Sequence, residues 1–264
     1  MLIDVHGHFG QRIAGVAPPA RISTYAGVCG ADLVLVSNRD AASEPAGAAN
    51  LDEAEANLAC LSACREHSHL VPLYWVRPGL ADSNVNALAG ALLTEPFAGA
   101  VFAPTDNGYD VADPRLGPYL ALLAKVGRPV LFCIGADERT APHKIHDRGR
   151  RYPSLPIVLC PCGAPAGQRA AALDAVRYAI QRNDAQLYLD TSHADADEVC
   201  TAVRTVGAER VLFGSNAVHY GESHIPRHIA LLEELRAALV PEEFQQVAGG
   251  SAARLFGLSP QAGG

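Results

Sequence analysis

The chain opens with Leu2-Ile3-Asp4-Val5-His6-Gly7-His8, a short apolar run that ends in two histidines separated by one residue. Such a run is typical of a buried β-strand. Because side chains alternate across a strand, His6 and His8 are expected to point to the same side, and Asp4 is expected to share it. Two imidazoles at one strand end could supply two ligands to a divalent metal such as zinc. A polar strand end that simply meets solvent would show the same pattern. Residues elsewhere in the chain are needed to distinguish this interpretation from a metal site.

Seven further apolar runs predict strands at residues 31–37, 70–76, 98–103, 129–134, 156–160, 186–190 and 210–214. Each strand is followed by a predicted helix, at residues 21–28, 50–66, 84–93, 114–126, 142–151, 167–181, 195–206 and 226–239, with an extra C-terminal helix at 241–258. Eight such units predict the α/β class and a (β/α)8 TIM barrel, formed by residues 1–264 as a single domain. An open doubly wound sheet is the alternative, but the first loop lacks the G-x-G-x-x-G phosphate motif.

Bulk composition excludes several classes of protein. The 264 residues are 49% hydrophobic and 19% charged, as in a globular protein, and the net charge of -7 argues against a nucleic-acid partner. No apolar run of about 18 residues predicts a membrane span. The N-terminus lacks the basic and apolar segments of a signal peptide, and the seven cysteines are an odd number. These features favour a cytoplasmic protein with reduced thiols.

Polar and metal-ligating side chains recur where the predicted strands end, which is where barrel enzymes collect their functional residues. We interpret as candidates His6 and His8, the segment 37–39, Arg77, Asp106, Cys133, Cys160 and Cys162, Asp190, His193 and Asn216, with His219 three residues further on.

Several of these segments resemble a known family. Residues 3–8, 129–135, 155–159, 187–192 and 210–216 resemble successive barrel segments of the amidohydrolase superfamily, and the ending at 251–258 is similar to the closing helix of its amidohydrolase-related branch. That branch holds metal-dependent hydrolases and decarboxylases of the aminocarboxymuconate-semialdehyde type. The resemblance implies a hydrolase or decarboxylase that acts on a small carboxylate, lactone or amide at the C-terminal mouth of the barrel.

The metal ligands of that family are only partly present. The family uses His-x-His on strand one, a histidine ending strand five, often a histidine ending strand six, and an aspartate after strand eight. Here His6 and His8 match the first pair, whereas Cys133, Pro161 and Asn216 stand at the other positions. A Cys133 thiolate could complete a site for zinc or manganese with His6 and His8. Asn216 could orient a substrate or water, but an amide cannot take a proton as an aspartate does.

The remaining candidates divide by chemistry. His193 and His219 lie in loops after strands seven and eight, and either imidazole could transfer protons alongside Cys133 and Asn216. Candidate substrate-binding residues are Arg77, Asp106 and Asp190.

Two cysteines flank Pro161. If Pro161 takes the inward position of the family's histidine, alternation turns Cys160 and Cys162 toward the outer helices as packing residues.

Three functional hypotheses follow. The first is an amidohydrolase-type enzyme with an altered zinc or manganese site. The second is a metal-free lyase or cyclase that uses the retained histidines, and the third is a catalytically inactive relative that pairs with an active one. The expected partner is a small-molecule substrate, and either a homodimer or a heterodimer with a related barrel stays open.

Overall fold

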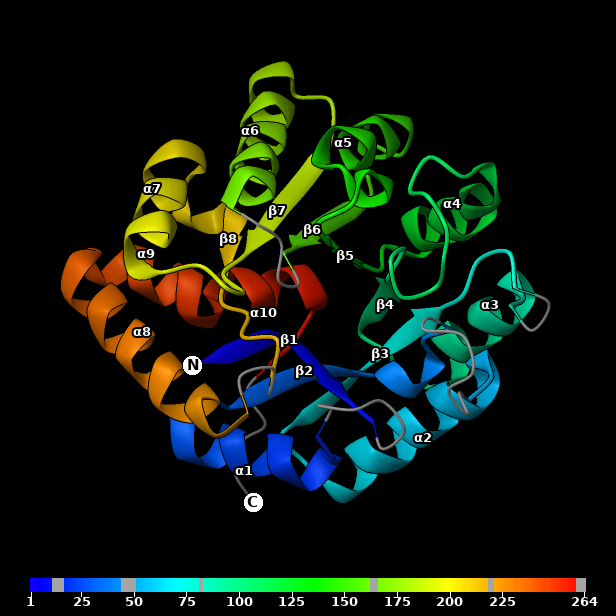
Figure 1. Cartoon of the computed structure of the whole chain (residues 1–264), viewed down its shortest axis with the longest axis horizontal. Coiled ribbons are helices and arrows are strands. Elements are labelled where there is room, and N and C mark those ends of the chain that lie inside the picture. Colours follow the sequence, from blue (N-terminus) through cyan, green and yellow to red (C-terminus); the bar gives the residue numbers. More distant parts are fainter. Residues whose placement is uncertain (11–16, 44–50, 81–82, 162–165, 218–220, 260–264) are drawn as a thin grey trace.

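Eight parallel strands lie side by side in chain order and curve into a nearly closed barrel (Figure 1). The structure, a computed structural model, describes residues 1–10, 17–43, 51–80, 83–161, 166–217 and 221–259. Its strands are β1 (Ile3–Phe9), β2 (Leu33–Asn38), β3 (Leu70–Val76), β4 (Gly99–Phe102), β5 (Val130–Cys133), β6 (Pro156–Cys160), β7 (Gln186–Asp190) and β8 (Val211–Leu212). The backbone of β1 also bonds to the segment after β8, because Ala217 N donates to His6 O at 3.1 Å. The predicted (β/α)8 barrel is therefore confirmed.

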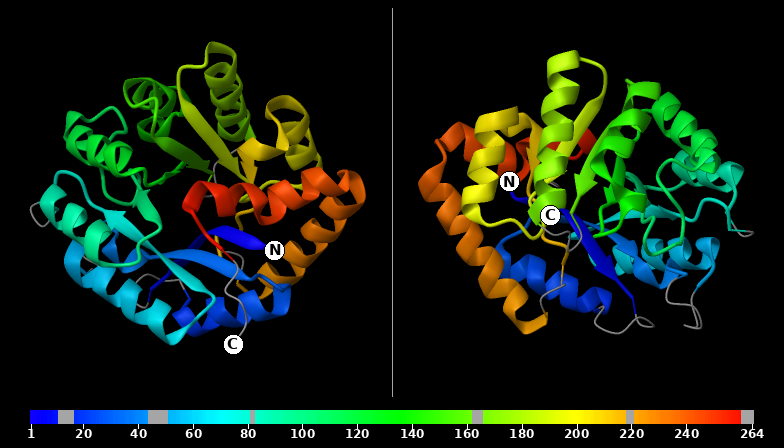
Figure 2. Two further views of the ribbon diagram at one scale, coloured as in Figure 1. Left: turned by 180° about the vertical axis from the view of Figure 1, so that it is seen from behind. Right: turned by 45° about the horizontal axis from the view of Figure 1, so that its top comes forward.

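Helices surround the strands and connect each one to the next (Figures 1 and 2). They are α1 (Pro19–Cys29), α2 (Glu53–Glu66), α3 (Val85–Thr94), α4 (Gly117–Val126), α5 (Pro142–Arg151), α6 (Ala166–Arg182), α7 (Ala196–Val206), α8 (His224–Ala238), α9 (Pro241–Gln245) and α10 (Ser251–Phe256). The helix predicted at 241–258 is thus divided, with a π-helical turn at Gln246–Gly250 between α9 and α10. No helix in the described ranges is long and apolar enough to cross a membrane.

The interior of the barrel is filled by apolar side chains. Leu73, Val101, Leu131 and Val158 belong to one buried cluster that the strands contribute. Ala252 and Phe256 of α10 join the same cluster, so α10 packs across the N-terminal end of the barrel, as seen in the left view of Figure 2. Burial of this size supplies the main driving force for folding. It also leaves the C-terminal ends of the strands as the open side.

A β-bulge in β1 changes which side chains face inward. Asp4 pairs with Val34 and Gly7 with Val36, so β1 uses one more residue than β2 between the two pairs. A bulge of this kind interrupts the alternation of a strand. His6 and His8 consequently point together into the barrel, while Asp4 points outward. The expectation that Asp4 shares the face of the histidines is therefore wrong.

Asp4 instead ties β1 to the helices and to the segment after β8. Its carboxylate accepts hydrogen bonds from Tyr25 Oη on α1 at 2.8 Å, from His6 N at 3.0 Å and from Ser215 N at 3.0 Å. Burial raises the pKa of Asp4, while the bonds from Ser215, His6 and Tyr25 favour the ionised form. The same carboxylate thus fixes the backbone on both sides of the closure between β1 and β8.

The packing of α8 against this region predicts a pH-dependent stability. Burial lowers the pKa of His228, whose Nδ1 donates to His224 O at 2.8 Å. Below about pH 6.5 the unfolded chain binds a proton at this imidazole that the folded chain does not. We expect the free energy of unfolding to fall with acidity, by up to about 1 kcal/mol per pH unit from this residue.

Urea unfolding of wild type and His228→Gln at pH 7.5 and pH 5.5 measures the effect. The variant should lose less stability than wild type between the two pH values. Equal losses in both proteins would show that His228 does not contribute.

The approach of β4 to β5 predicts a second stability effect. A Cβ added at Gly99 would lie 2.5 Å from Pro129 O, whose carbonyl accepts the β4–β5 hydrogen bond from Ala100 N. Neither backbone can move without disturbing the sheet, so Gly99→Ala should lower the free energy of unfolding by about 1–3 kcal/mol. The matched control is Gly90→Ala in α3, where the added Cβ meets nothing within 4 Å. That change should raise the free energy of unfolding by about 0.5–1 kcal/mol, and destabilisation in both variants would contradict the steric explanation.

Candidate active site

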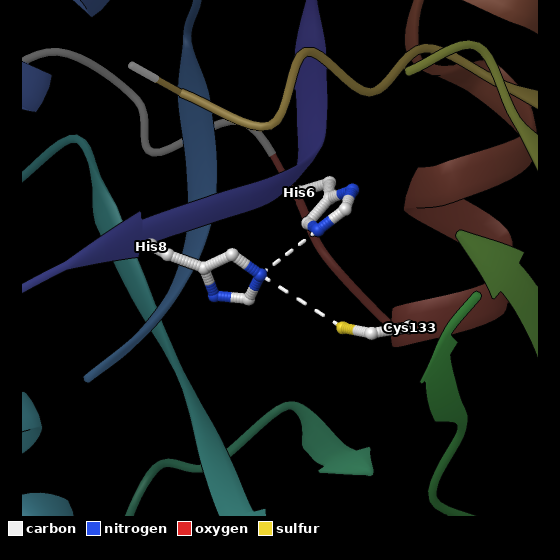
Figure 3. Close-up of side chains that lie close together, drawn as sticks. All are labelled: His6, His8 and Cys133. Atoms are coloured by element: carbon white, nitrogen blue, oxygen red, sulfur yellow. Dashed lines mark hydrogen bonds between the residues drawn. The ribbon is translucent and has the colours of Figure 1, made fainter. Parts of the chain in front are cut away.

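The two histidines of β1 meet the cysteine that ends β5 inside the barrel (Figure 3). His6 Nε2 lies 2.9 Å from His8 Nε2, and His8 Nε2 lies 3.9 Å from Cys133 Sγ. One ligand atom from each of the three side chains falls within 4.8 Å of the other two. All three are buried, with exposed fractions of 1%, 7% and 8% for His6, His8 and Cys133. The structure therefore brings together the three residues that the sequence suggested as metal ligands.

The far nitrogen of each imidazole is held by a second residue. His6 Nδ1 lies 2.7 Å from Asp190 Oδ2 at the end of β7 and 2.8 Å from Ser192 Oγ. His8 Nδ1 lies 2.8 Å from Ser37 Oγ in β2. Such partners fix the orientation of a ring and are usual around metal-binding histidines. Here they direct both Nε2 atoms toward each other and toward Cys133.

The charges of the two imidazoles differ. Burial alone would lower the pKa of His6, but the charge of Asp190 and the hydrogen bond to it raise that pKa to about 10. Burial lowers the pKa of His8, and the positive charge of His6 lowers it further. The hydrogen bond and the charge of Cys133 act in the opposite direction but do not cancel this effect. The raised pKa of His6 and the lowered pKa of His8 favour a charged His6 beside a neutral His8, so His6 Nε2 would be the donor in the 2.9 Å contact with His8 Nε2. A metal ion held by both Nε2 atoms would have to displace that proton.

A second cysteine faces the same space. Cys160 of β6 pairs in register with Cys133 of β5 and belongs to the interior cluster of the barrel. Its Sγ, a ligand atom of His6 and one of Asp190 lie within 4.8 Å of one another. Burial raises the pKa of Cys160, and the negative charge of Asp190 raises it further.

The prediction that Cys160 turns toward the outer helices is therefore wrong. It depended on placing Pro161 inward, but the inward position of β6 falls one residue earlier. Both faces of β6 are apolar, so the sequence carries no alternation that could have fixed this phase. Cys162 lies outside the described residues.

A pocket of about 230 Å³ lies beside Cys133 and His8. Its lining includes His8, Cys133 and Asn216, together with Arg39 and Asp106. These residues come from the C-terminal ends of strands β1, β2, β4 and β5 and from the segment after β8, so the pocket lies at the open side of the barrel. Its size suits a small molecule, because it is below the usual range of about 300–1,000 Å³ for drug-sized ligands.

Arg39 and Asp106 form an ion pair in the wall of this pocket. Arg39 Nε and one terminal nitrogen donate to the two carboxylate oxygens of Asp106, each at 3.1 Å. Both side chains are partly exposed, at 33% and 22%. Asp106, a predicted substrate-binding residue, thus lines the pocket with its carboxylate bonded to Arg39. Arg39 belongs to the candidate segment 37–39 at the end of a predicted strand, but the sequence alone assigned it no role in substrate binding.

The remaining candidates lie at different distances from the pocket. Asn216 lines it and adopts a positive φ of 56°, and its Nδ2 lies 3.1 Å from His193 Nε2. Asp190 stands behind His6, and its carboxylate is bonded to that imidazole. Arg77 donates to Leu51 O at 2.6 Å, and it is not among the described residues that line the pocket. His219 lies outside the described residues.

Fold and site together define a class of protein. It is a (β/α)8 barrel in which two histidines of the first strand lie beside a possible metal ligand at the end of a later strand. Residues 3–258 match the family model described as Amidohydrolase, which is nearly the whole chain. The chain belongs to this amidohydrolase family. No curated protein sequence shows a significant match to the chain.

Solved structures of similar fold include decarboxylases and hydrolases. 2,6-Dihydroxybenzoate decarboxylase, solved with 2,6-dihydroxybenzoate, has a TM-score of 0.73 and 13% identity over 97% of this chain and 99% of its own. 5-Carboxyvanillate decarboxylase from Novosphingobium aromaticivorans, solved with manganese, has a TM-score of 0.73 and 12% identity. The match covers 98% of this chain and 96% of the decarboxylase. An amidohydrolase from Burkholderia multivorans with bound zinc has a TM-score of 0.72 and 16% identity. The match covers 98% of this chain and 100% of that amidohydrolase. At these identities the likeness concerns the fold.

Proposed function

We propose that this chain is a zinc-dependent enzyme that hydrolyses or decarboxylates a small carboxylate, lactone or amide in the pocket beside Cys133. The observation that carries the proposal is that one ligand atom from each of His6, His8 and Cys133 lies within 4.8 Å of the other two, next to a pocket lined by His8 and Cys133. Three protein ligands with room for a fourth group are the usual composition of a catalytic zinc site. Family membership supports the same reaction class.

The donor set fits zinc better than manganese. Two imidazoles and one thiolate are borderline to soft ligands, which suit zinc, whereas manganese prefers carboxylate, carbonyl and water oxygens. Asp190 and Ser37 hold the far nitrogens of the two histidines, as expected for ligands of a metal. A zinc ion held there would supply Lewis-acid polarisation of a substrate carbonyl or carboxylate.

The chain's own polar residues would bind and orient the substrate. Arg39 presents a positive charge to the pocket and suits an anionic substrate, with Asp106 holding its guanidinium in place. Asn216 offers an amide to hydrogen-bond the substrate, but it cannot accept a proton. We therefore assign proton transfer to His193, whose Nε2 lies 3.1 Å from Asn216 Nδ2, with His219 as the other candidate.

A metal-free enzyme is the second candidate, and one observation favours it. His6 and His8 share a short Nε2–Nε2 contact of 2.9 Å, with the pKa of His6 raised and that of His8 lowered. One ring is then a proton donor and the other a proton acceptor, which is the arrangement general acid–base catalysis needs. A lyase or cyclase reaction would use this pair.

Metal analysis of protein purified without chelator or nickel resin separates these candidates. We expect stoichiometric zinc, and substitution of cobalt should give a near-ultraviolet sulfur-to-cobalt absorption. Cys133→Ser should remove that absorption. Cys200→Ser, at a buried cysteine of α7, should keep it.

Protein that binds neither zinc nor cobalt would overturn the zinc proposal. A histidine-dependent turnover in that protein would then support the metal-free enzyme. A search across small carboxylates, lactones and amides that finds no turnover, together with co-purification of a second barrel, would support an inactive partner.

We also propose that the enzyme works in the cytoplasm, as a homodimer or as a heterodimer with a related barrel. None of the six cysteines of the described ranges forms a disulfide bond, which suits a reducing compartment.

A further inference from the structure

The two inward cysteines stand directly opposite each other on neighbouring strands. The β5–β6 register pairs Cys133 with Cys160, and both side chains join the interior cluster that contains Leu131 and Val158. Neighbouring strands lie about 4.8 Å apart, so the two Cα atoms fall within the range of about 4.4–6.8 Å that disulfides take. Opposed positions on the same face of a sheet also aim the two Cβ atoms in the same direction.

One member of the pair can be reached from the pocket. Cys133 lines the pocket, whereas Cys160 lies behind it with no exposed surface. A small oxidant would therefore meet Cys133 first and find a second thiol on the adjacent strand. The other neighbouring cysteines of the described chain, Cys60 and Cys64, lie on α2 and do not line this pocket.

We propose that Cys133 and Cys160 form a reversible disulfide when the protein meets a peroxide, and that this bond switches the site off. Cys133 sulfur attacks the peroxide, the O–O bond breaks, and hydrogen peroxide yields a sulfenic acid at Cys133 and one water. Cys160 sulfur then attacks the Cys133 sulfur, and the hydroxyl group leaves as a second water after taking the Cys160 proton. The two thiols are oxidised and the peroxide is reduced. A dithiol restores both thiols by exchange.

This inference rests in part on the proposed function, because a sulfur in a disulfide is not a thiolate ligand. Zinc binding at Cys133 and the disulfide therefore exclude each other. Bound zinc should slow the oxidation, and the oxidised protein should bind zinc at least about tenfold more weakly than the reduced protein.

Peptide mapping of the full, metal-stripped chain tests the disulfide directly. After hydrogen peroxide and alkylation, trypsin should leave peptide 126–139, which holds Cys133, joined to peptide 152–169, which holds Cys160 and Cys162. The experiment is therefore run on a Cys162→Ser background, so that one cysteine remains in each peptide. Adding Cys160→Ser should abolish the joined peptide, whereas adding Cys200→Ser should leave it unchanged.

The expected result is a joined peptide in the Cys162→Ser protein that disappears on treatment with dithiothreitol and that zinc suppresses. Oxidation of Cys133 to a sulfinic acid with Cys160 still free would overturn the proposal. If the Cys160→Ser variant does not fold, Cys160→Ala is the substitute, because alanine removes the thiol and places no new polar group in the buried cluster that holds Cys160.

Failure of the two proposals can be told apart. Reduced protein that does not bind zinc but forms the joined peptide would overturn the proposed function and leave the disulfide standing. Reduced protein that binds zinc but never forms the joined peptide would overturn the disulfide alone.

Discussion

His8→Ala will lower the affinity of the chain for zinc at least about a hundredfold. His8 Nε2 is the atom that lies close to both His6 Nε2 and Cys133 Sγ, at 2.9 Å and 3.9 Å. Without it, two protein ligands remain, and a tight zinc site needs three or four. Loss of a residue that only orients a metal ligand typically lowers metal affinity about 10–100-fold. Loss of the ligand itself should therefore lower the affinity by about 100-fold or more.

Competition with a chromophoric chelator measures the affinity of wild type and variant. The matched control is His143→Ala, because His143 is an exposed histidine of α5 that faces Glu138 and not the pocket. We expect His143→Ala to bind zinc as wild type does. An equal, small loss in both variants would show that zinc binds to surface histidines and not between His6 and His8.

Asp190→Asn will reduce the number of protons released on zinc binding by about one. In the wild-type protein without metal, the pKa of His6 is raised to about 10, so His6 carries a proton at pH 7.5 that zinc must displace. Without the negative charge of Asp190, burial lowers the pKa of His6 and the ring is neutral before zinc arrives.

The pH dependence follows with a definite sign. As pH rises from 6.5 to 8.5, proton competition at His6 weakens, so this residue makes the wild-type zinc affinity rise about tenfold per pH unit. The Asp190→Asn variant should lose this contribution at pH values above the lowered pKa of His6. Calorimetric titration in buffers of different ionisation enthalpy counts the protons.

A neutral neighbour supplies the control. Ser192 Oγ also lies 2.8 Å from His6 Nδ1, but it carries no charge. Ser192→Ala should therefore release as many protons as wild type. If Asp190→Asn does so too, the charge of Asp190 does not set the protonation of His6.

The barrel and three of its inward side chains could be predicted because they depend on local patterns. Short apolar runs between helices indicate parallel strands, and His6, His8 and Cys133 end such runs. The ends of parallel strands meet at one side of a barrel, so these residues were expected to gather there. Resemblance to the family pointed to the same three positions.

Three features of the site could not be predicted, because they depend on how distant segments of the chain pair. The outward direction of Asp4 results from a bulge in β1, which is defined only by its register with β2. The inward direction of Cys160 results from its register with Cys133, in a strand whose two faces are equally apolar. The ion pair that holds the Arg39 guanidinium depends on a partner, Asp106, that lies 67 residues away in the chain.

The packing of α10 against the N-terminal end of the barrel has a consequence for molecular traffic. Ala252 and Phe256 are buried in one cluster with strand residues, so α10 covers that end of the barrel. If the chain acts as we propose, substrate and product would both pass through the open C-terminal side of the barrel. We then expect the product to inhibit the enzyme in competition with the substrate.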